Sequence, residues 1–282
     1  VLLFTTGDEV VLFERQPQVG GQINLAAKAP QRDQMAGIVR WLDMETKRLG
    51  VDRRLGVEAD TSAILAETPD IVVLATGGRS FTDQVPDWGV SDGLAVSSWD
   101  ILSEKLAPAE NVLVYDAIST HAGFGTADFL ASRGATVEMV TPDVKVADDV
   151  GGTTFPIFYR RLYKQGIIPT PNFWLDRVYA EGNKKVAVLR NEYTEELEER
   201  VVDQVVIENG TTPNAELYFA LKDRALNKGQ VHMESLFAHK PQPMLNEPTG
   251  EGSFLMFRIG DCVSMHNIHA AIYDAVRLCK DF

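Results

Sequence analysis

The residues best suited to bind a nucleotide cofactor stand where an apolar run ends near the start of the chain. Glu14 closes the run Val10–Phe13, and the glycines Gly20 and Gly21 follow a short polar bridge. A carboxylate at the carboxyl end of a strand accepts hydrogen bonds from ribose hydroxyls, and glycines let the backbone approach a ligand closely. The alternative is a charged residue that simply ends a strand at the surface.

Two later runs end in similar residues. The stretch Ala75–Gly78 closes one of them, and its small side chains leave room for a flat ligand, although a tight glycine turn explains the pattern equally well. Gly260 and Asp261 close the last run, before a helix whose free N–H groups favour electron density on a reduced flavin. Asp261 then binds a hydroxyl of the flavin side chain, or it is a plain cap or turn residue.

The elements that must position these residues alternate between apolar runs and amphipathic stretches, which favours an α/β fold with parallel sheets. The predicted strands cover residues 10–14, 70–78, 111–116, 136–141, 201–207 and 254–261, and the predicted helices cover residues 35–49, 126–133 and 267–280. Residues 172–208 have the pattern of a meander with a solvated acidic run, and residues 79–98 resemble a connection between domains.

The order of these motifs resembles that of two-domain FAD/NAD(P) flavoproteins, which implies two Rossmann-like nucleotide-binding domains, one inserted in the other. The FAD-binding domain is expected to comprise residues 1–87 and 231–282, and the NAD(P)-binding-like domain residues 88–230. Only nine residues precede the run that ends at Glu14, too few for a first strand, a glycine-rich phosphate loop and a helix. That first strand and loop are expected to be missing, as in a chain cut from a longer protein, and FAD retention by this chain alone is expected to be weak.

Composition narrows the class of protein. The formal net charge of −13 disfavours binding to nucleic acid or to an anionic membrane, and no apolar run reaches the roughly 20 residues that cross a bilayer. Cys262 and Cys279 do not form a C-x-x-C pair, so neither a redox-active disulfide nor a cysteine-ligated metal is expected here. Two isolated thiols favour a cytoplasmic location.

Together these motifs resemble the C-terminal half of the trimethylamine dehydrogenase and 2,4-dienoyl-CoA reductase family, within its dimethylglycine and N-methylproline demethylase-like branch. The resemblance is carried by "FERQPQVGGQINLAAKAP", "IVVLATGG", "NVLVYDAISTHAGFGTADFLASRGATVEMVTP", "ENGTTPNAELYFALK" and "NIHAAIYDAVRLCKDF". It implies a flavin-dependent, iron–sulfur oxidoreductase whose FMN barrel domain and 4Fe–4S cluster belong to a preceding segment. It also implies a homo-oligomer, and substrates that are N-methylated amines or enoyl compounds bound by the barrel.

The resemblance further implies a set of cofactor-binding residues for FAD or ADP. These are Glu14, Arg15, Gly21, Gln22, Val57, Ala75, Thr76, Gly77, Asp261, Asn267, Ile268 and Ala271. Glu14 and Arg15 are assigned to the adenosine half, and Val57 to the adenine through its backbone. No residue of this chain is assigned to substrate chemistry or to a metal.

The predicted NAD(P)-binding-like domain departs from the dinucleotide fingerprint. After the run 112–115, Asp116 stands where a small residue would admit a pyrophosphate, and its charge opposes a phosphate. His121, Gly123 and Gly125 are candidates for a wider NAD(P)-binding loop. Two functions stay open. One is electron relay between NADH, NADPH or an electron carrier and the FMN barrel, and the other is a nucleotide-binding or structural module without turnover.

Overall fold

The computed structural model describes residues 9–82, 86–238, 240–245 and 254–279. Contacts between Cα atoms divide the chain into two compact units. Unit 1 comprises Val1–Gln22, Gly37–Arg79 and Thr211–Phe282, and unit 2 comprises Ile23–Ala36 and Ser80–Gly210. The assignment of residues 1–87 and 231–282 to an FAD domain, and of residues 88–230 to an inserted domain, remains a prediction.

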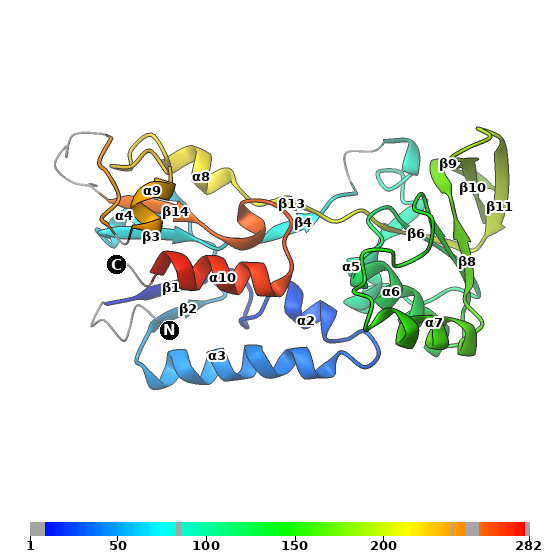
Figure 1. Ribbon diagram of the computed structural model, residues 1–282, viewed down its shortest axis with the longest axis horizontal. Helices are drawn as coiled ribbons and strands as arrows, with labels where there is room; N and C mark the ends of the chain where they lie inside the picture. Colours follow the sequence, from blue (N-terminus) through cyan, green and yellow to red (C-terminus); the bar gives the residue numbers. More distant parts are fainter. Residues whose placement is uncertain (1–8, 83–85, 239, 246–253, 280–282) are drawn as a thin grey trace. The chain divides into compact units, whose positions relative to one another are not determined.

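Unit 1 is built on pairs of short parallel strands (Figure 1). Strand β1 (Val11–Glu14) pairs with β2 (Asp52–Leu55), and β3 (Ile71–Leu74) pairs with β14 (Leu255–Arg258), each as a separate two-stranded sheet. Strand β4 (Gly78–Ser80) pairs with β13 (Thr211–Pro213). The helices are α3 (Ala36–Arg48), α4 (Thr61–Ala66), α8 (Glu216–Leu221), α9 (Met233–Phe237) and α10 (Ile268–Cys279), with the 3₁₀ turn η3 (Gly260–Cys262).

Unit 2 contains a five-stranded parallel sheet in the order β5-β12-β6-β7-β8. Its strands are β5 (Ala95–Ser97), β6 (Asn111–Asp116), β7 (Thr136–Thr141), β8 (Ile168–Pro171) and β12 (Gln204–Glu208), and an antiparallel sheet joins β9 (Phe173–Glu181), β10 (Lys184–Asn191) and β11 (Leu197–Val202). The helical segments are α2 (Gln22–Ala26), η1 (Asp33–Met35), η2 (Pro86–Trp88), α5 (Ser98–Leu102), α6 (His121–Ser132) and α7 (Phe155–Lys164).

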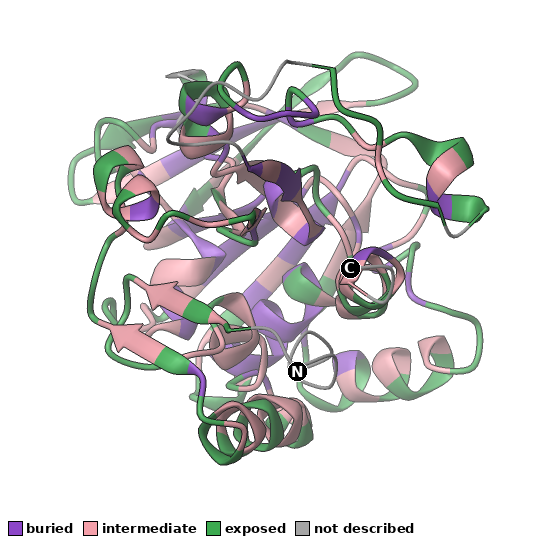
Figure 2. Cartoon of the chain, turned by 90° about the vertical axis from the view of Figure 1, so that its left-hand side faces the viewer, coloured by how far each residue is buried: buried purple, intermediate pink, exposed green. Residues whose placement is uncertain are grey.

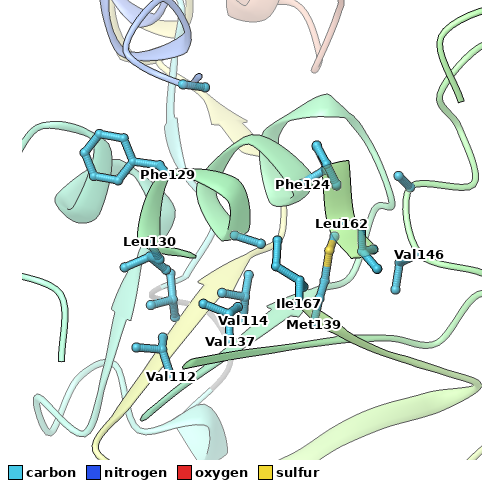
Figure 3. Packing of buried hydrophobic residues seen from close by; sticks show 14 of the residues in the cluster. Val112, Val114, Phe124, Phe129, Leu130, Val137, Met139, Val146, Leu162 and Ile167 are labelled. Atoms are coloured by element: carbon cyan, nitrogen blue, oxygen red, sulfur yellow. The ribbon is translucent and has the colours of Figure 1, made fainter. Parts of the chain in front are cut away.

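The parallel sheet of unit 2 is buried on both faces because successive side chains of a strand point in opposite directions. On β6, Val112 and Val114 pack with Leu130 of α6 and Leu162 of α7 (Figure 3). The alternate residues of β6 and β12 pack instead against side chains of β9 and β10. Buried residues accordingly gather on the strands, whereas loops and outer helix faces are exposed (Figure 2).

The prediction of an α/β fold with parallel sheets is confirmed, and the predicted helices at 35–49 and 267–280 match α3 and α10 within a few residues. The single strand predicted over 201–207 is wrong. Strand β11 ends at Val202 in the antiparallel sheet, and β12 begins at Gln204 in the parallel sheet. Asp203 lies between them, where its N–H bonds the carbonyl of Asn111 at 2.9 Å.

Two further predictions are corrected. The connection assigned to residues 79–98 contains β5, an edge strand of the parallel sheet. Helix α6 begins at His121 rather than at residue 126, because Thr120 caps it by accepting a hydrogen bond from the Ala122 N–H. None of the helices within the described ranges has the length and apolarity that a membrane span requires.

Candidate cofactor site

Asp261 joins segments of unit 1 that are far apart in the sequence. Its Oδ2 accepts a hydrogen bond from Gln22 Nε2 at 3.1 Å, across 239 residues of chain, and another from Thr211 Oγ1 at 3.4 Å. Its Oδ1 accepts the His266 N–H at 2.9 Å. A carboxylate has about four acceptor positions, so one remains for a ligand hydroxyl. The structure thus brings two of the predicted cofactor residues, Gln22 and Asp261, into direct contact.

The residues after β3 form a second part of the same cluster. Thr76 Oγ1 donates to the Asn214 carbonyl at 2.6 Å, and Asn214 Nδ2 returns a bond to the Thr76 carbonyl at 3.1 Å. The Asn214 N–H also bonds the Gly77 carbonyl at 2.9 Å. Gly77 has φ +67°, and a Cβ there would lie 3.7 Å from Gln22 Nε2. These bonds tie Thr76 and Gly77 to Asn214, with Gly77 beside Gln22 in a backbone conformation that glycine adopts without strain.

Thr211 and Asn214 are positioning residues that the sequence reasoning did not include in the site. Both residues belong to the segment "NGTTPN", which lies in one of the stretches that carry the family resemblance. The sequence did not reveal that the Thr211 side chain donates a hydrogen bond to Asp261 and the Asn214 side chain donates one to the Thr76 carbonyl.

Glu14, Arg15 and Val57 lie together at the ends of β1 and β2. The Val57 N–H donates to the Glu14 carbonyl at 3.0 Å, and Glu14 Oε1 accepts the Gln16 N–H at 2.8 Å. Arg15 forms an exposed ion pair with Glu58 at 3.7 Å. Among the described residues, no hydrogen bond or ion pair joins this group to the Asp261 cluster. The predicted adenosine end and flavin end are therefore two separate groups within unit 1.

Helix α10 packs against the turn that carries Asp261. Gly260 has φ +60°, and a Cβ at this position would lie 3.2 Å from the Cβ of Ala271. Its N–H donates to Asp274 Oδ2 at 3.2 Å. Asn267 Oδ1 accepts the Ala270 N–H at 2.9 Å and so caps the first turn, next to Ile268. The predicted residues of α10 therefore stand beside Asp261 at the helix N-terminus. No group of His, Cys, Asp or Glu side chains that could hold a metal occurs in the described part of the chain.

In unit 2 a side chain of the protein itself occupies the end of β6, where the dinucleotide fingerprint expects a small residue. Asp116, at the end of β6, is fully buried, and its Oδ1 accepts the N–H groups of Ile118 at 3.2 Å and Ser119 at 2.9 Å. A Cβ on Gly123 would lie 2.1 Å from Asp116 Oδ2. His121, Gly123 and Gly125 belong to α6, so the wider loop expected for them is wrong. Gly123 is small because it accommodates this carboxyl group.

Burial raises the pKa of Asp116 well above its ordinary value, and the neighbouring Glu208 carboxyl raises it further. Glu208 is in register with Asp116 on the adjacent strand β12, and burial raises its pKa too. Glu208 is bonded by Ser98 Oγ and by the Gly210 N–H at 2.9 Å. Asp116 Oδ2 has no hydrogen-bond partner among the described residues. The two strand ends thus carry carboxyl groups that favour the protonated form.

Comparison with known proteins yields relatives named as dehydrogenases and demethylases, although no family model matches the chain. The chain is 56% identical to an N,N-dimethylglycine/sarcosine dehydrogenase of Chromohalobacter salexigens over 98% of its length and 41% of that protein. It is 40% identical to a probable N-methylproline demethylase of Rhizobium meliloti over 98% of its length and 40% of that protein. The chain thus spans about two fifths of the length of these relatives.

Solved structures show the same fold at lower identity. A 2-naphthoyl-CoA reductase matches 99% of this chain and 37% of its own, with TM-score 0.80 and 20% identity. The thioredoxin reductase of T. acidophilum matches 99% of this chain and 91% of its own, with TM-score 0.66 and 15% identity. These likenesses confirm the fold predicted from the sequence.

Proposed function

Because this chain belongs to the trimethylamine dehydrogenase and 2,4-dienoyl-CoA reductase family, we propose that its unit 1 binds FAD or ADP within a flavin-dependent oxidoreductase. The observation that carries the proposal is the cluster in which Asp261 accepts hydrogen bonds from Gln22 and Thr211 beside the N-terminus of α10. An acidic side chain held this way binds a ligand hydroxyl, and the helix terminus favours negative charge.

In our proposal, different residues of unit 1 bind different parts of the nucleotide. Glu14, with Arg15 and the backbone of Val57, meets the adenosine half. Gly21 and Gln22 lie by the pyrophosphate, and Ala75, Thr76 and Gly77 line the ligand's path. Asp261 binds the sugar-like chain, and Asn267, Ile268 and Ala271 present the helix terminus to the ring. A bound flavin would supply electron transfer, while these residues hold it and set its electrostatic surroundings.

For the longer protein we propose an FMN barrel domain and a 4Fe–4S cluster outside this chain. The relatives' names point to N-methylated amines or amino acids as substrates, with enoyl compounds as the alternative. Electrons would pass between the barrel and a pyridine nucleotide or an electron carrier. We also propose a cytoplasmic homo-oligomer. Each of these is a property of the whole protein rather than of the segment described.

The second candidate is a module that holds ADP, or no nucleotide, and supports assembly without turnover. One observation favours it for unit 2, namely the Asp116 carboxyl group packed over Gly123. A nicotinamide dinucleotide needs both the turn amides and the space that this carboxyl occupies. If NADH or NADPH serves the enzyme, it must enter by displacing Asp116 or bind elsewhere.

Asp261→Ala should remove the nucleotide from unit 1. In the purified complete protein we expect one FAD or ADP per chain, beyond any FMN, measured by chromatography of the released nucleotides. The variant should bind that nucleotide at least about tenfold more weakly, since a hydrogen bond to a charged group contributes roughly 1.5–3 kcal/mol. Asp92→Ala, which changes an exposed carboxylate of unit 2, is the matched control.

The released nucleotide also distinguishes the two candidates. FAD supports the electron-transferring role, and ADP alone supports the non-catalytic module. A wild-type protein that neither carries nor binds an adenine nucleotide would contradict the nucleotide-binding proposal for unit 1 and leave a structural module as the remaining candidate.

A further inference from the structure

A cavity of about 220 Å³ lies within unit 2, outside all the positions assigned to FAD or NAD(P) except Gly125. Its walls include Arg32 and Met35 from the loop between α2 and α3, Phe124 and Asp128 from α6, and Phe158 and Arg161 from α7. Pockets for drug-sized ligands usually measure about 300–1,000 Å³. The cavity therefore suits a molecule smaller than a dinucleotide.

The cavity is on the opposite side of α6 from Asp116. Successive residues of an α-helix are rotated by about 100°, so Gly123 and Gly125 point in nearly opposite directions. Gly123 faces Asp116, whereas a Cβ on Gly125 would lie 3.0 Å from Ala29, in the segment that leads to the Arg32 loop. The cavity is thus distinct from the position that Asp116 occupies at the end of β6.

The two arginines of the cavity differ in their partners. Arg161 forms a bidentate pair with Asp128, at 2.8 Å from Nε to Oδ2 and 2.9 Å from Nη2 to Oδ1, and Gln165 also contacts Oδ1. Within the described residues the Arg32 guanidinium has a single hydrogen-bond partner, the Met35 sulfur at 3.4 Å, and no carboxylate forms an ion pair with it. Burial lowers the pKa of Arg32. A half-buried guanidinium without a counter-ion is a costly arrangement that a bound anion would relieve.

The wall beside Arg32 is aromatic. The rings of Phe124 and Phe158 are stacked, with centroids 4.3 Å apart and an angle of 15° between planes. His121 packs edge-on against Phe158 at 5.3 Å, and its buried Nδ1 has no partner among the described residues. Burial lowers the pKa of His121, and the Arg32 charge lowers it further. The cavity therefore combines a guanidinium that has no carboxylate partner among the described residues with a flat apolar wall, and His121 packs against the Phe158 ring of that wall.

We propose that this cavity binds a small aromatic carboxylate, with the carboxylate paired to Arg32 and the ring against Phe124 and Phe158. The planar guanidinium matches a carboxylate with two parallel hydrogen bonds, and aromatic rings pack favourably in offset or edge-on contact. Asp128 is paired with Arg161 in a bidentate ion pair and forms none with Arg32 among the described residues.

Sodium benzoate is the probe, titrated into the purified protein by isothermal calorimetry, with benzyl alcohol and inorganic phosphate in parallel. Benzoate should bind more tightly than either. Arg32→Gln should weaken benzoate binding by about 10- to 100-fold, the loss expected for a hydrogen-bonded charge pair. Phe158→Leu should weaken the binding of benzoate but leave the binding of phosphate unchanged. Arg160→Gln, which changes an exposed arginine of α7, should bind benzoate as tightly as the wild type does.

A second measurement gives the pKa of His121 with and without benzoate. Because a bound anion opposes the Arg32 charge, benzoate should raise the pKa of His121, as seen in its ring-proton NMR titration. Thermal unfolding of each variant confirms that it is folded. Binding of benzyl alcohol as tight as that of benzoate, or unchanged binding in Arg32→Gln, overturns the proposal. Phosphate binding equal to that of benzoate and insensitive to Phe158→Leu would show a plain anion site and overturn the aromatic assignment.

Discussion

Gly123→Ala should lower the free energy of unfolding by at least about 1–3 kcal/mol, the usual cost of an extra methyl group in a packed interior. The new Cβ would lie 2.1 Å from Oδ2, 2.2 Å from Cγ and 2.7 Å from Cβ of Asp116. Asp116 cannot swing away freely, because it is fully buried and its Oδ1 is held by two backbone N–H groups. Urea unfolding followed by circular dichroism measures the change.

A control tests whether the Asp116 carboxyl group causes the loss of stability in Gly123→Ala. In an Asp116→Ala background, Gly123→Ala should cost less than in the wild type, because the two nearest atoms, Oδ2 and Cγ of Asp116, are gone and only its Cβ, at 2.7 Å, remains. Gly152→Ala should have little effect, since no atom lies within 4 Å of the Cβ it would add. Equal costs of Gly123→Ala in both backgrounds would show that Asp116 does not fill this position.

Asp116→Asn should gain stability relative to the wild type as the pH rises. Burial raises the pKa of Asp116 in the folded protein, so the protonated carboxyl is favoured there. Its stabilising contribution is present below the unfolded-state pKa of about 3.9 and is lost as the pH rises toward the folded-state value. The amide stays neutral throughout. The stability difference should therefore shift toward the variant by up to about 1.4 kcal/mol per pH unit.

Urea unfolding of both proteins from pH 5 to pH 8 gives this difference directly. Glu208→Gln should shift in the same direction, because burial raises the pKa of Glu208 as well. Asp92→Asn, at an exposed position, should show no such trend. A stability difference that does not change with pH would mean that Asp116 is ionised in the folded protein.

The sequence predicted the strands of the parallel sheet well where apolar runs are continuous. Residues 111–116 and 136–141 were predicted as strands and form β6 and β7 with those bounds, because strands covered on both faces are apolar throughout. The prediction from the sequence failed at the start of α6, where the local signals conflict. Gly123 and Gly125 weaken a helical pattern, yet both lie inside α6, where close packing against Asp116 and Ala29 requires them to be small.

The candidate site was predicted only in part, because its contacts join distant segments. The motifs marked Gln22 and Asp261, but the bond between them depends on the fold as a whole. The sequence also suggested that Asp116 would oppose a phosphate by its charge. The structure gives a different reason, in which a carboxyl group that favours its protonated form occupies the space. Nothing in the pattern around Arg32 indicated a cavity, since its walls come from three separate segments.

The separate strand pairs of unit 1 have a consequence for amide hydrogen exchange. In the described sheets β1 pairs only with β2 and β3 only with β14, whereas β6 has a partner on each side. Two-stranded sheets are marginal by themselves, and a free strand edge leaves backbone groups to the solvent. Deuterium should therefore enter β1 and β3 well before β6. A ligand held by the loops after these strands would slow the entry of deuterium, since a ligand that binds the folded state stabilises it.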